Sequence, residues 1–342
     1  MGHAPEGSAK APDKRAARAM IAVVHLVWGP LGAARLRSFI SSYRRYPAGV
    51  EHDLVILLNG VDHEMRGVYD GELDGVDHRL VSLPHPLQDL AAYAWAAKSL
   101  HYDRYCFLNS YSVILAEHWL AKLDAALEGE RVGLAGASGS WGSFHSAALD
   151  SLHVPNPYRR AGGPGRERSR ELAAEVDREL DDVDRATAGA HSPSGAAGAP
   201  RGLTRYSDRL ARLAEYLFHF PGFPSEHLRT NAFMADRAAL EVLRSATLAS
   251  KTDALRFESG RASITRRLDA QGLRALVVDR AGHCFDRTRW PASRTFWQGD
   301  QEGLMIADNR TLIYTNGPLE RRAMLSRFAW GASADPRAPV SS

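Results

Sequence analysis

Blocks of apolar residues alternate with amphipathic segments along the first half of the chain. Residues 20–28 form an apolar run broken only by His25, which predicts a buried strand that ends in a turn at Gly29. Residues 32–46 then carry apolar side chains at helical spacing. Further strands are predicted at residues 53–58, 79–83, 105–108 and 131–137. Strands that alternate with helices are typical of βαβ units, so we predict an α/β fold with a mainly parallel, Rossmann-like sheet flanked by helices.

This pattern predicts a single large domain with one insertion and two tails. The first half covers residues 20–150 and the second half residues 206–330, where strands and helices resume. Between them, residues 151–205 are rich in Gly, Pro, Ala and Arg, and predict a flexible insertion with one amphipathic helix near residues 166–186. Residues 1–19 and 331–342 are expected to be disordered tails.

Polar residues and glycines follow the predicted strands. They are Trp28 and Gly29, Asn59 and Gly60, residues 109–112, and residues 138–141. The strand at 105–108 ends directly in Asn109, Ser110, Tyr111 and Ser112. Open α/β sheets bind ligands outside the carboxyl ends of their strands, so we expect the functional site at this edge.

Composition and charge indicate which binding partners and which cellular compartment to expect. The net charge is only +3, from 43 lysines and arginines against 40 acids, and no aromatic-interleaved basic stripe indicates nucleic acid. Two cysteines, Cys106 and Cys284, exclude a disulfide framework and favour the cytoplasm. No apolar run reaches the ~18–20 residues that span a bilayer. The basic residues of the first 18 predict at most a peripheral contact with an anionic membrane face.

Familiar catalytic motifs are missing or incomplete. Gly133, Gly136 and Gly139 have dinucleotide-loop spacing, but only a short possible helix and no strand follow them, so we interpret the segment as a pocket-lining loop. The sequence has no phosphate loop, no Gly-x-Ser-x-Gly elbow and no His-Glu-x-x-His.

Two later segments contain the other candidate functional residues. Residues 227–237 read H-L-R-T-N-A-F-M-A-D-R, and residues 257–268 read F-E-S-G-R-A-S-I-T-R-R-L. In the second segment, Glu258 is expected to open a helix that continues to residue 271. A glutamate at that position could simply favour the positive end of the helix, or it could act as a base.

Taken together, residues 20–285 resemble a GT-A type glycosyltransferase, family-2-like but divergent. The run H-Y-D-R-Y-C-F-L-N-S at 101–110 is similar to the approach to the family's aspartate motif, and 257–268 to its acidic motif and following helix. Two departures stand out. Residues 109–112 lack the metal-binding aspartates, and Ser259 replaces the second acid.

The resemblance implies a sugar transfer from a nucleotide-sugar donor to a glycan, lipid-linked or small-molecule acceptor, as in cell-surface polysaccharide synthesis. It implies inversion, with Glu258 as the base. The residues expected to bind the donor are Trp28, Gly29, Asn59, Asp89, Asn109, Ser110 and Ser112. The residues expected to bind its diphosphate are Arg261, Arg266 and His283. Because Mg²⁺ and Mn²⁺ would lack carboxylate ligands at 109–112, we expect weak or absent metal dependence and no required cofactor.

Two other classes stay open. A non-catalytic GT-A-like nucleotide-binding or scaffold protein would keep the fold without the chemistry, and the missing aspartates support it. Another α/β transferase, such as a methyltransferase, would need a glycine-rich turn after the first strand, where Pro30 removes one backbone donor.

Overall fold

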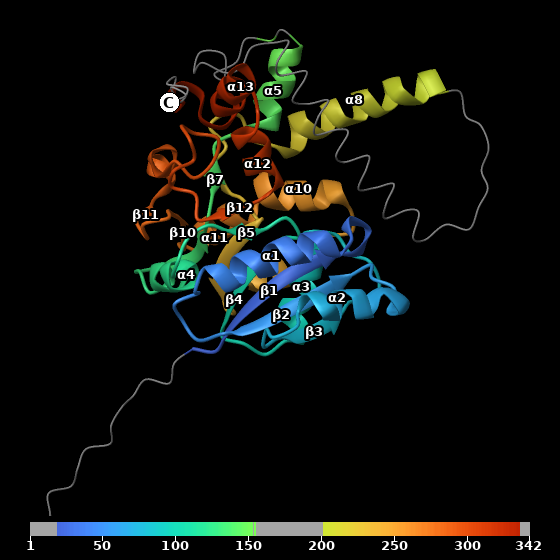
Figure 1. Ribbon diagram of the computed structural model, residues 1–342. Helices are drawn as coiled ribbons and strands as arrows, with labels where there is room; N and C mark the ends of the chain where they lie inside the picture. The colour runs from blue at the N-terminus through green and yellow to red at the C-terminus, as the bar shows by residue number, and fades with distance from the viewer. Residues whose placement is uncertain (1–18, 153, 155–200, 336–342) are drawn as a thin grey trace, which may run out of the picture.

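An eight-stranded sheet runs through the residues that the computed structural model describes, 19–152, 154 and 201–335 (Figure 1). Its strand order is β11-β10-β6-β9-β4-β1-β2-β3. The strands are β1 (Ile21–Trp28), β2 (Asp53–Asn59), β3 (Arg79–Ser82), β4 (Arg104–Leu108), β6 (Val132–Gly136), β9 (Ala232–Asp236), β10 (Arg274–Val278) and β11 (Cys284–Phe285). β9 is antiparallel to β4 and β6, β11 is antiparallel to β10, and the other neighbours are parallel. The predicted mainly parallel α/β sheet is confirmed.

The sheet changes its direction of growth between β1 and β4. From β1 the chain builds outward through β2 to β3, then returns to place β4 on the opposite side of β1. Such a switch point opens a crevice at the carboxyl ends of the two strands. Trp28 ends β1, and residues 109–112 follow β4, so both lie at the mouth of this crevice.

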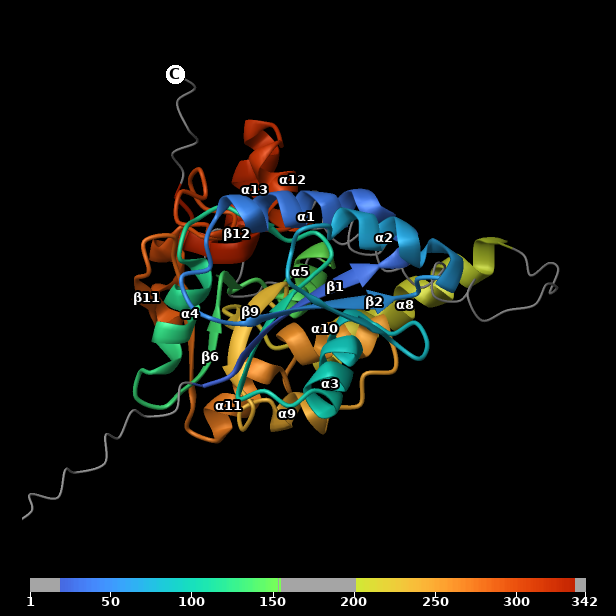
Figure 2. The same cartoon turned by 60° about the horizontal axis from the view of Figure 1, so that its bottom comes forward.

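Helices cover both faces of the sheet, as Figure 2 shows. The side chains of β1 alternate: Ala22, Val24 and Leu26 enter one core, and Ile21, Val23 and Val27 enter the other. The first core is covered by α3 (Asp89–Ser99), α9 (Glu241–Arg244), α10 (Lys251–Ser259) and α11 (Ile264–Ala270). The second is covered by α1 (Ala33–Arg45), α2 (Arg66–Glu72) and α4 (Trp119–Leu127).

The remaining elements form a layer above one end of the sheet (Figure 1), and several of their side chains, Trp290 and Trp330 among them, belong to the first core. They are α5 (Phe144–Ser151), α8 (Arg201–His219), α12 (Asn309–Thr315), α13 (Leu319–Trp330) and the short helices η3 (Arg287–Ser293) and η4 (Gly331–Ser333). Two small ribbons join this layer to the sheet: β5 (Val113–Ile114) with β12 (Ile306–Ala307), and β7 (Gly139–Ser140) with β8 (His227–Leu228). Short helices η1 (Gly29–Leu31) and η2 (His63–Met65) lie near the strand ends.

The sequence expectations for residues 288–333 need correction, and others concern residues outside the described ranges. The many Trp and Arg residues of 288–316 favour a loop, but this segment contains α12, whose first turn is closed by a capping box of Asp308 and Thr311. The C-terminal tail was expected from residue 331, yet Ser333 accepts a hydrogen bond from Gln298 Nε2 (2.9 Å). The expected helix at 166–186 and the tails at 1–18 and 336–342 lie outside the described residues.

The two predicted halves share one sheet, because β9 and β10 from the second half pair with β4 and β6 from the first. Residues 20–150 and 206–330 therefore belong to one body. Among the described residues, no helix combines the length and the apolar character that a membrane span requires.

Candidate functional site

The carboxyl ends of β1, β2 and β4 are in direct contact. The Trp28 amide donates to Ser110 Oγ (3.0 Å), which joins the end of β1 to the loop after β4. Gly29 lies against Gly60, and a side chain on Gly29 would collide with the Gly60 carbonyl oxygen. The Trp28 ring in turn packs over Gly60. Glycine at 29 is therefore required by the close approach of two backbones, and the structure brings Trp28, Gly29 and Ser110 together.

A Gly29→Ala variant is expected to be less stable than the wild type by about 1–3 kcal/mol, because the added methyl forces two strand ends apart. Urea denaturation measures the loss. Gly67→Ala is the matched control, since a methyl there meets no atom within 4 Å. Equal stability of the two variants would contradict the close contact at Gly29.

Asn59 fixes the loop that leads into α3. Its side chain is fully buried; Nδ2 donates to the Leu87 carbonyl (2.7 Å), and Oδ1 accepts from the Leu87 amide (2.9 Å). This pair of bonds sets the start of α3, where Asp89 is the first residue. The Asn59 side-chain amide thus holds the loop at Leu87. Asp89, at the start of α3, is half-buried.

The side chains of the 109–112 loop hold the loop itself. Asn109 Oδ1 accepts from the Tyr111 amide (3.1 Å) and from Ser112 Oγ (3.1 Å), while Ser110 Oγ accepts from the Trp28 amide. These neutral oxygens are occupied, and no carboxylate stands with them. They do not fit a site for a divalent cation, which prefers carboxylate oxygens. Elsewhere in the described ranges, no three His, Cys, Asp or Glu side chains gather in a way that could hold a metal ion.

The segment before β9 brings Glu258 to the same edge. Because β9 is antiparallel to β4, residues 227–231 lie at the carboxyl end of β4, and the Asn109 amide donates to the Asn231 carbonyl (3.0 Å). The neighbouring Thr230 donates to Glu258 Oε2 twice, from its amide (3.1 Å) and from Oγ1. Glu258 is therefore held next to the crevice by a buried threonine.

The expectation that Glu258 opens a helix was wrong. α10 ends at Ser259, so Glu258 lies in its last turn, and α11 begins separately at Ile264 with Ser263 as its cap. A carboxylate at a helix C-terminus is unfavourable, because that end of the helix carries partial negative charge. The helix-dipole explanation therefore fails, and the contact with Thr230 offsets an intrinsically poor position.

Two buried side chains that the sequence did not single out lie near this carboxylate. Tyr93 is one turn after Asp89 in α3 and stacks on Phe107 (4.7 Å between ring centroids), with no hydrogen-bond partner for its hydroxyl. Burial raises the pKa of Tyr93 well above its ordinary value, and the charges of Asp89 and Glu258 add to the effect. Burial lowers the pKa of His227 despite the nearby Glu258, so its imidazole is neutral at pH 7.

Arg229, which precedes Thr230 in the sequence, forms a buried ion pair. Arg229 Nη2 is 2.7 Å from Asp308 Oδ2, and the guanidinium stands 4.1 Å from the Phe296 ring centroid. Burial alone would raise the pKa of Asp308, but the Arg229 charge and hydrogen bonds, including that from the Thr311 amide, hold it below its ordinary value. The D-x-x-T cap at 308–311 was the sequence signal that could have revealed this helix start.

The three residues expected at the diphosphate are dispersed. Arg261 Nε donates to the Phe218 carbonyl (3.0 Å) at the end of α8. His283 follows β10, pairs with Asp279 (3.1 Å), and is separated from β4 by β6 and β9. Arg266 stands 3.8 Å from Glu226, next to His227 in sequence, and is the member of the three near the site.

A different cation lies at the switch point. Arg35 in the first turn of α1 is exposed, and its guanidinium is 4.9 Å from the ring centroid of Tyr111. This contact joins the helix after β1 to the loop after β4. No acid in the described part of the chain pairs with Arg35.

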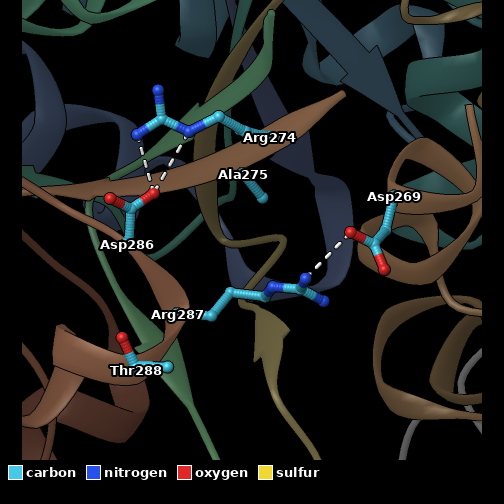
Figure 3. Close-up of a pocket in the computed structure, with 6 residues that line it drawn as sticks. All are labelled: Asp269, Arg274, Ala275, Asp286, Arg287 and Thr288. Carbon is cyan, nitrogen blue, oxygen red and sulfur yellow. Dashed lines mark hydrogen bonds and ion pairs between the residues drawn. The ribbon is translucent and has the colours of Figure 1, made fainter. Parts of the chain in front are cut away.

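A shallow pocket elsewhere on the surface does not coincide with this site (Figure 3). Arg274 begins β10, so the pocket lies at the opposite end of that strand from the crevice. Both of its arginines are neutralised: Arg274 pairs with Asp286 (2.7 Å) and Arg287 with Asp269 (2.8 Å). Each arginine of this pocket is thus matched by an acid.

No protein-family model and no curated protein matches the sequence. Similar solved structures include a mannosyltransferase, PcManGT, from Pyrobaculum calidifontis in complex with GDP-Man and Mn²⁺, at 10% identity and a TM-score of 0.42, over 81% of this chain and 60% of that one. TarS 1-349 of S. aureus is similar at 12% identity and a TM-score of 0.27, over 34% of each chain.

The galactosyltransferase LgtC, in complex with donor and acceptor sugar analogs, is similar at 14% identity and a TM-score of 0.27, over 34% of this chain and 46% of that one. The chain thus spans less than two thirds of the length of these proteins. Independently of them, the helix-flanked, mainly parallel sheet of this chain agrees with the GT-A-like fold that the sequence resemblance implied.

Proposed function

We propose that this protein is an inverting glycosyltransferase that moves a sugar from a nucleotide-sugar donor to a hydroxyl of a glycan, lipid-linked or small-molecule acceptor. The observation that carries the proposal is the position of Glu258. Thr230 holds its carboxylate by two hydrogen bonds at the carboxyl edge of the sheet, beside a switch-point crevice. Such crevices bind nucleotides in open α/β sheets.

The chemistry follows from this arrangement. The Glu258 carboxylate takes the proton of the acceptor hydroxyl, whose oxygen then attacks the anomeric carbon. The bond from that carbon to the diphosphate oxygen breaks, and the nucleoside diphosphate leaves with the electron pair. A single base on the face opposite the leaving group gives inversion. Arg35 and Arg266 are the cations that we assign to the charge that grows on the diphosphate.

The donor would lie between the β1 and β4 ends, with Trp28 and Gly29 on one side and Asn109, Ser110 and Ser112 on the other. Asn59 would support the donor through the Leu87 loop, and Asp89 would face it from the start of α3. Both cysteines, Cys106 and Cys284, are free, which supports a reducing, cytoplasmic location. A lipid-linked acceptor in cell-surface polysaccharide synthesis would add a peripheral contact with the inner face of the membrane.

Calorimetric titration with a panel of nucleotide sugars, with Mn²⁺ and with EDTA, tests the proposal, and mass spectrometry detects transfer to added acceptors. We expect saturable binding of at least one donor in both conditions, followed by transfer. Absence of binding across the panel would refute the function. Binding without transfer to any acceptor would favour the non-catalytic nucleotide-binding alternative.

Replacement of Arg35 by alanine is expected to weaken donor binding about tenfold, the equivalent of one charge-assisted hydrogen bond. Arg37→Ala is the matched control, because Arg37 lies on the same helix but pairs with Glu72. Calorimetry measures both dissociation constants. An equal effect of the two substitutions would assign Arg35 to general surface charge.

A further inference from the structure

We propose that Arg229 and Asp308 are positioning residues, through which β12 and the start of α12 set the orientation of Glu258. The inference rests on the proposed function in that it takes Glu258 as the base. It adds a role for Asp308, which lies far from Glu258 in sequence and binds Arg229, whereas Glu258 is bound by the adjacent Thr230.

The Arg229 guanidinium is held on several sides. Nη2 donates to Asp308 Oδ2 (2.7 Å), Nη1 donates to Ser138 Oγ (3.3 Å), and its face lies 4.1 Å from the Phe296 centroid. The backbone of Arg229 is also anchored, since its amide donates to the Ser138 carbonyl (3.1 Å). With its side chain and backbone both fixed, Arg229 determines where the next residue, Thr230, points its hydroxyl and amide.

Asp308 is equally constrained. Its Oδ1 accepts from the Thr311 amide (2.8 Å), and its own amide donates to Thr311 Oγ1 (2.7 Å), so one carboxylate oxygen caps α12 while the other holds Arg229. Only 1% of the Asp308 side chain and 10% of the Arg229 side chain is exposed. The carboxylate therefore couples the start of α12 to the segment that carries Thr230.

The same elements form a closed path around the crevice. The 109–112 loop continues into β5, which pairs with β12 through Ile114 and Ile306. β12 leads to Asp308, Asp308 binds Arg229, and the adjacent Thr230 binds Glu258. The Asn109 amide closes the path by its bond to the Asn231 carbonyl. The 109–112 loop and Glu258 are thus connected to one another through β12 and the start of α12.

A buried ion pair is weak grounds for a stabilising role, because the cost of removing two charges from water offsets most of their attraction. An apolar pair of similar volume often preserves the fold. Arg229 and Asp308 make directional hydrogen bonds, which an apolar pair cannot make. This difference allows positioning to be separated from stability by experiment.

The test uses the full-length double variant Arg229→Met/Asp308→Leu, with Asp286→Asn as a control that breaks a surface pair. In ¹H–¹⁵N spectra we expect the double variant to keep a folded spectrum but to shift the amide peak of Glu258, which is distant in sequence from both substituted residues. With an active donor, kcat should fall about 10- to 100-fold, as expected for a displaced catalytic group, while the donor KM stays within about threefold.

An unmoved Glu258 peak in the folded double variant would overturn the inference, as would an unchanged kcat. If the double variant does not fold, Asp308→Glu replaces it, because it keeps the charge but displaces the carboxylate, and the same peak is read. The spectrum needs no substrate. A protein that transfers no sugar but shows the shift would contradict the proposed function and leave the structural coupling supported.

Discussion

Glu258→Gln is expected to lower kcat by about 10²–10⁴-fold, the usual contribution of a general base, while donor affinity changes less than about threefold. Glutamine has the shape of glutamate, and its amide oxygen can still accept from the Thr230 amide and hydroxyl, so the local structure should persist. It cannot accept the proton of an acceptor hydroxyl at neutral pH. The loss should therefore appear in turnover and not in binding.

Steady-state kinetics and calorimetry on the same preparation measure the two quantities. Glu241→Gln is the matched control, since Glu241 is an exposed glutamate in α9 that pairs with Arg244. We expect it to retain wild-type kinetics. Full activity of Glu258→Gln would remove Glu258 as the base, and equal losses in turnover and donor affinity would indicate a binding role instead.

His25→Leu is expected to stabilise the protein, and to do so more strongly in acid. His25 lies in the middle of β1, fully buried and stacked on Phe39 at 3.8 Å, and neither ring nitrogen has a hydrogen-bond partner. Removal of unsatisfied buried polar atoms should stabilise the fold by about 1–3 kcal/mol at pH 7.

The pH dependence follows from the titration of the same ring. Burial lowers the pKa of His25 to about 3, whereas an unfolded histidine has a pKa of about 6.5. Between these values the unfolded chain binds one proton more than the folded chain, so stability falls as the pH falls, by about 1.4 kcal/mol per pH unit. From pH 7 to pH 5 the wild type should lose about 2 kcal/mol through His25, and the leucine variant should not.

Urea denaturation at pH 7 and pH 5 measures this difference. His101→Leu is the control, because His101 is exposed. Parallel losses in the wild type and in His25→Leu between the two pH values would show that His25 is not a buried neutral histidine.

The first half of the fold could be predicted from the sequence because most of its strands are largely apolar runs between turn residues. The strands before Gly29 and Asn109 are examples, and both end where expected. The direction of β9 could not be predicted, since an apolar strand fits a sheet in either direction. Its antiparallel course is what carries Thr230, and with it Glu258, to the crevice.

The site was predictable where it depends on strand ends and unpredictable where it depends on tertiary packing. Trp28, Gly29 and Ser110 meet because carboxyl ends of adjacent parallel strands share one edge. Arg261 follows α10 and His283 follows β10; the place of these elements relative to β4 is set by tertiary packing and strand order, so it could not be inferred. The break at Gly260 and the Ser263 cap were visible signals that residues 257–271 form two helices.

A crystal structure with a bound nucleotide sugar tests the central claim most directly. We predict that the nucleotide lies in the crevice between the ends of β1 and β4, beside Trp28 and Asn109, with an Arg35 contact to the diphosphate. The anomeric carbon should face Glu258 with room for one acceptor hydroxyl between them. A nucleotide bound elsewhere, or a sugar that points away from Glu258, would contradict the account.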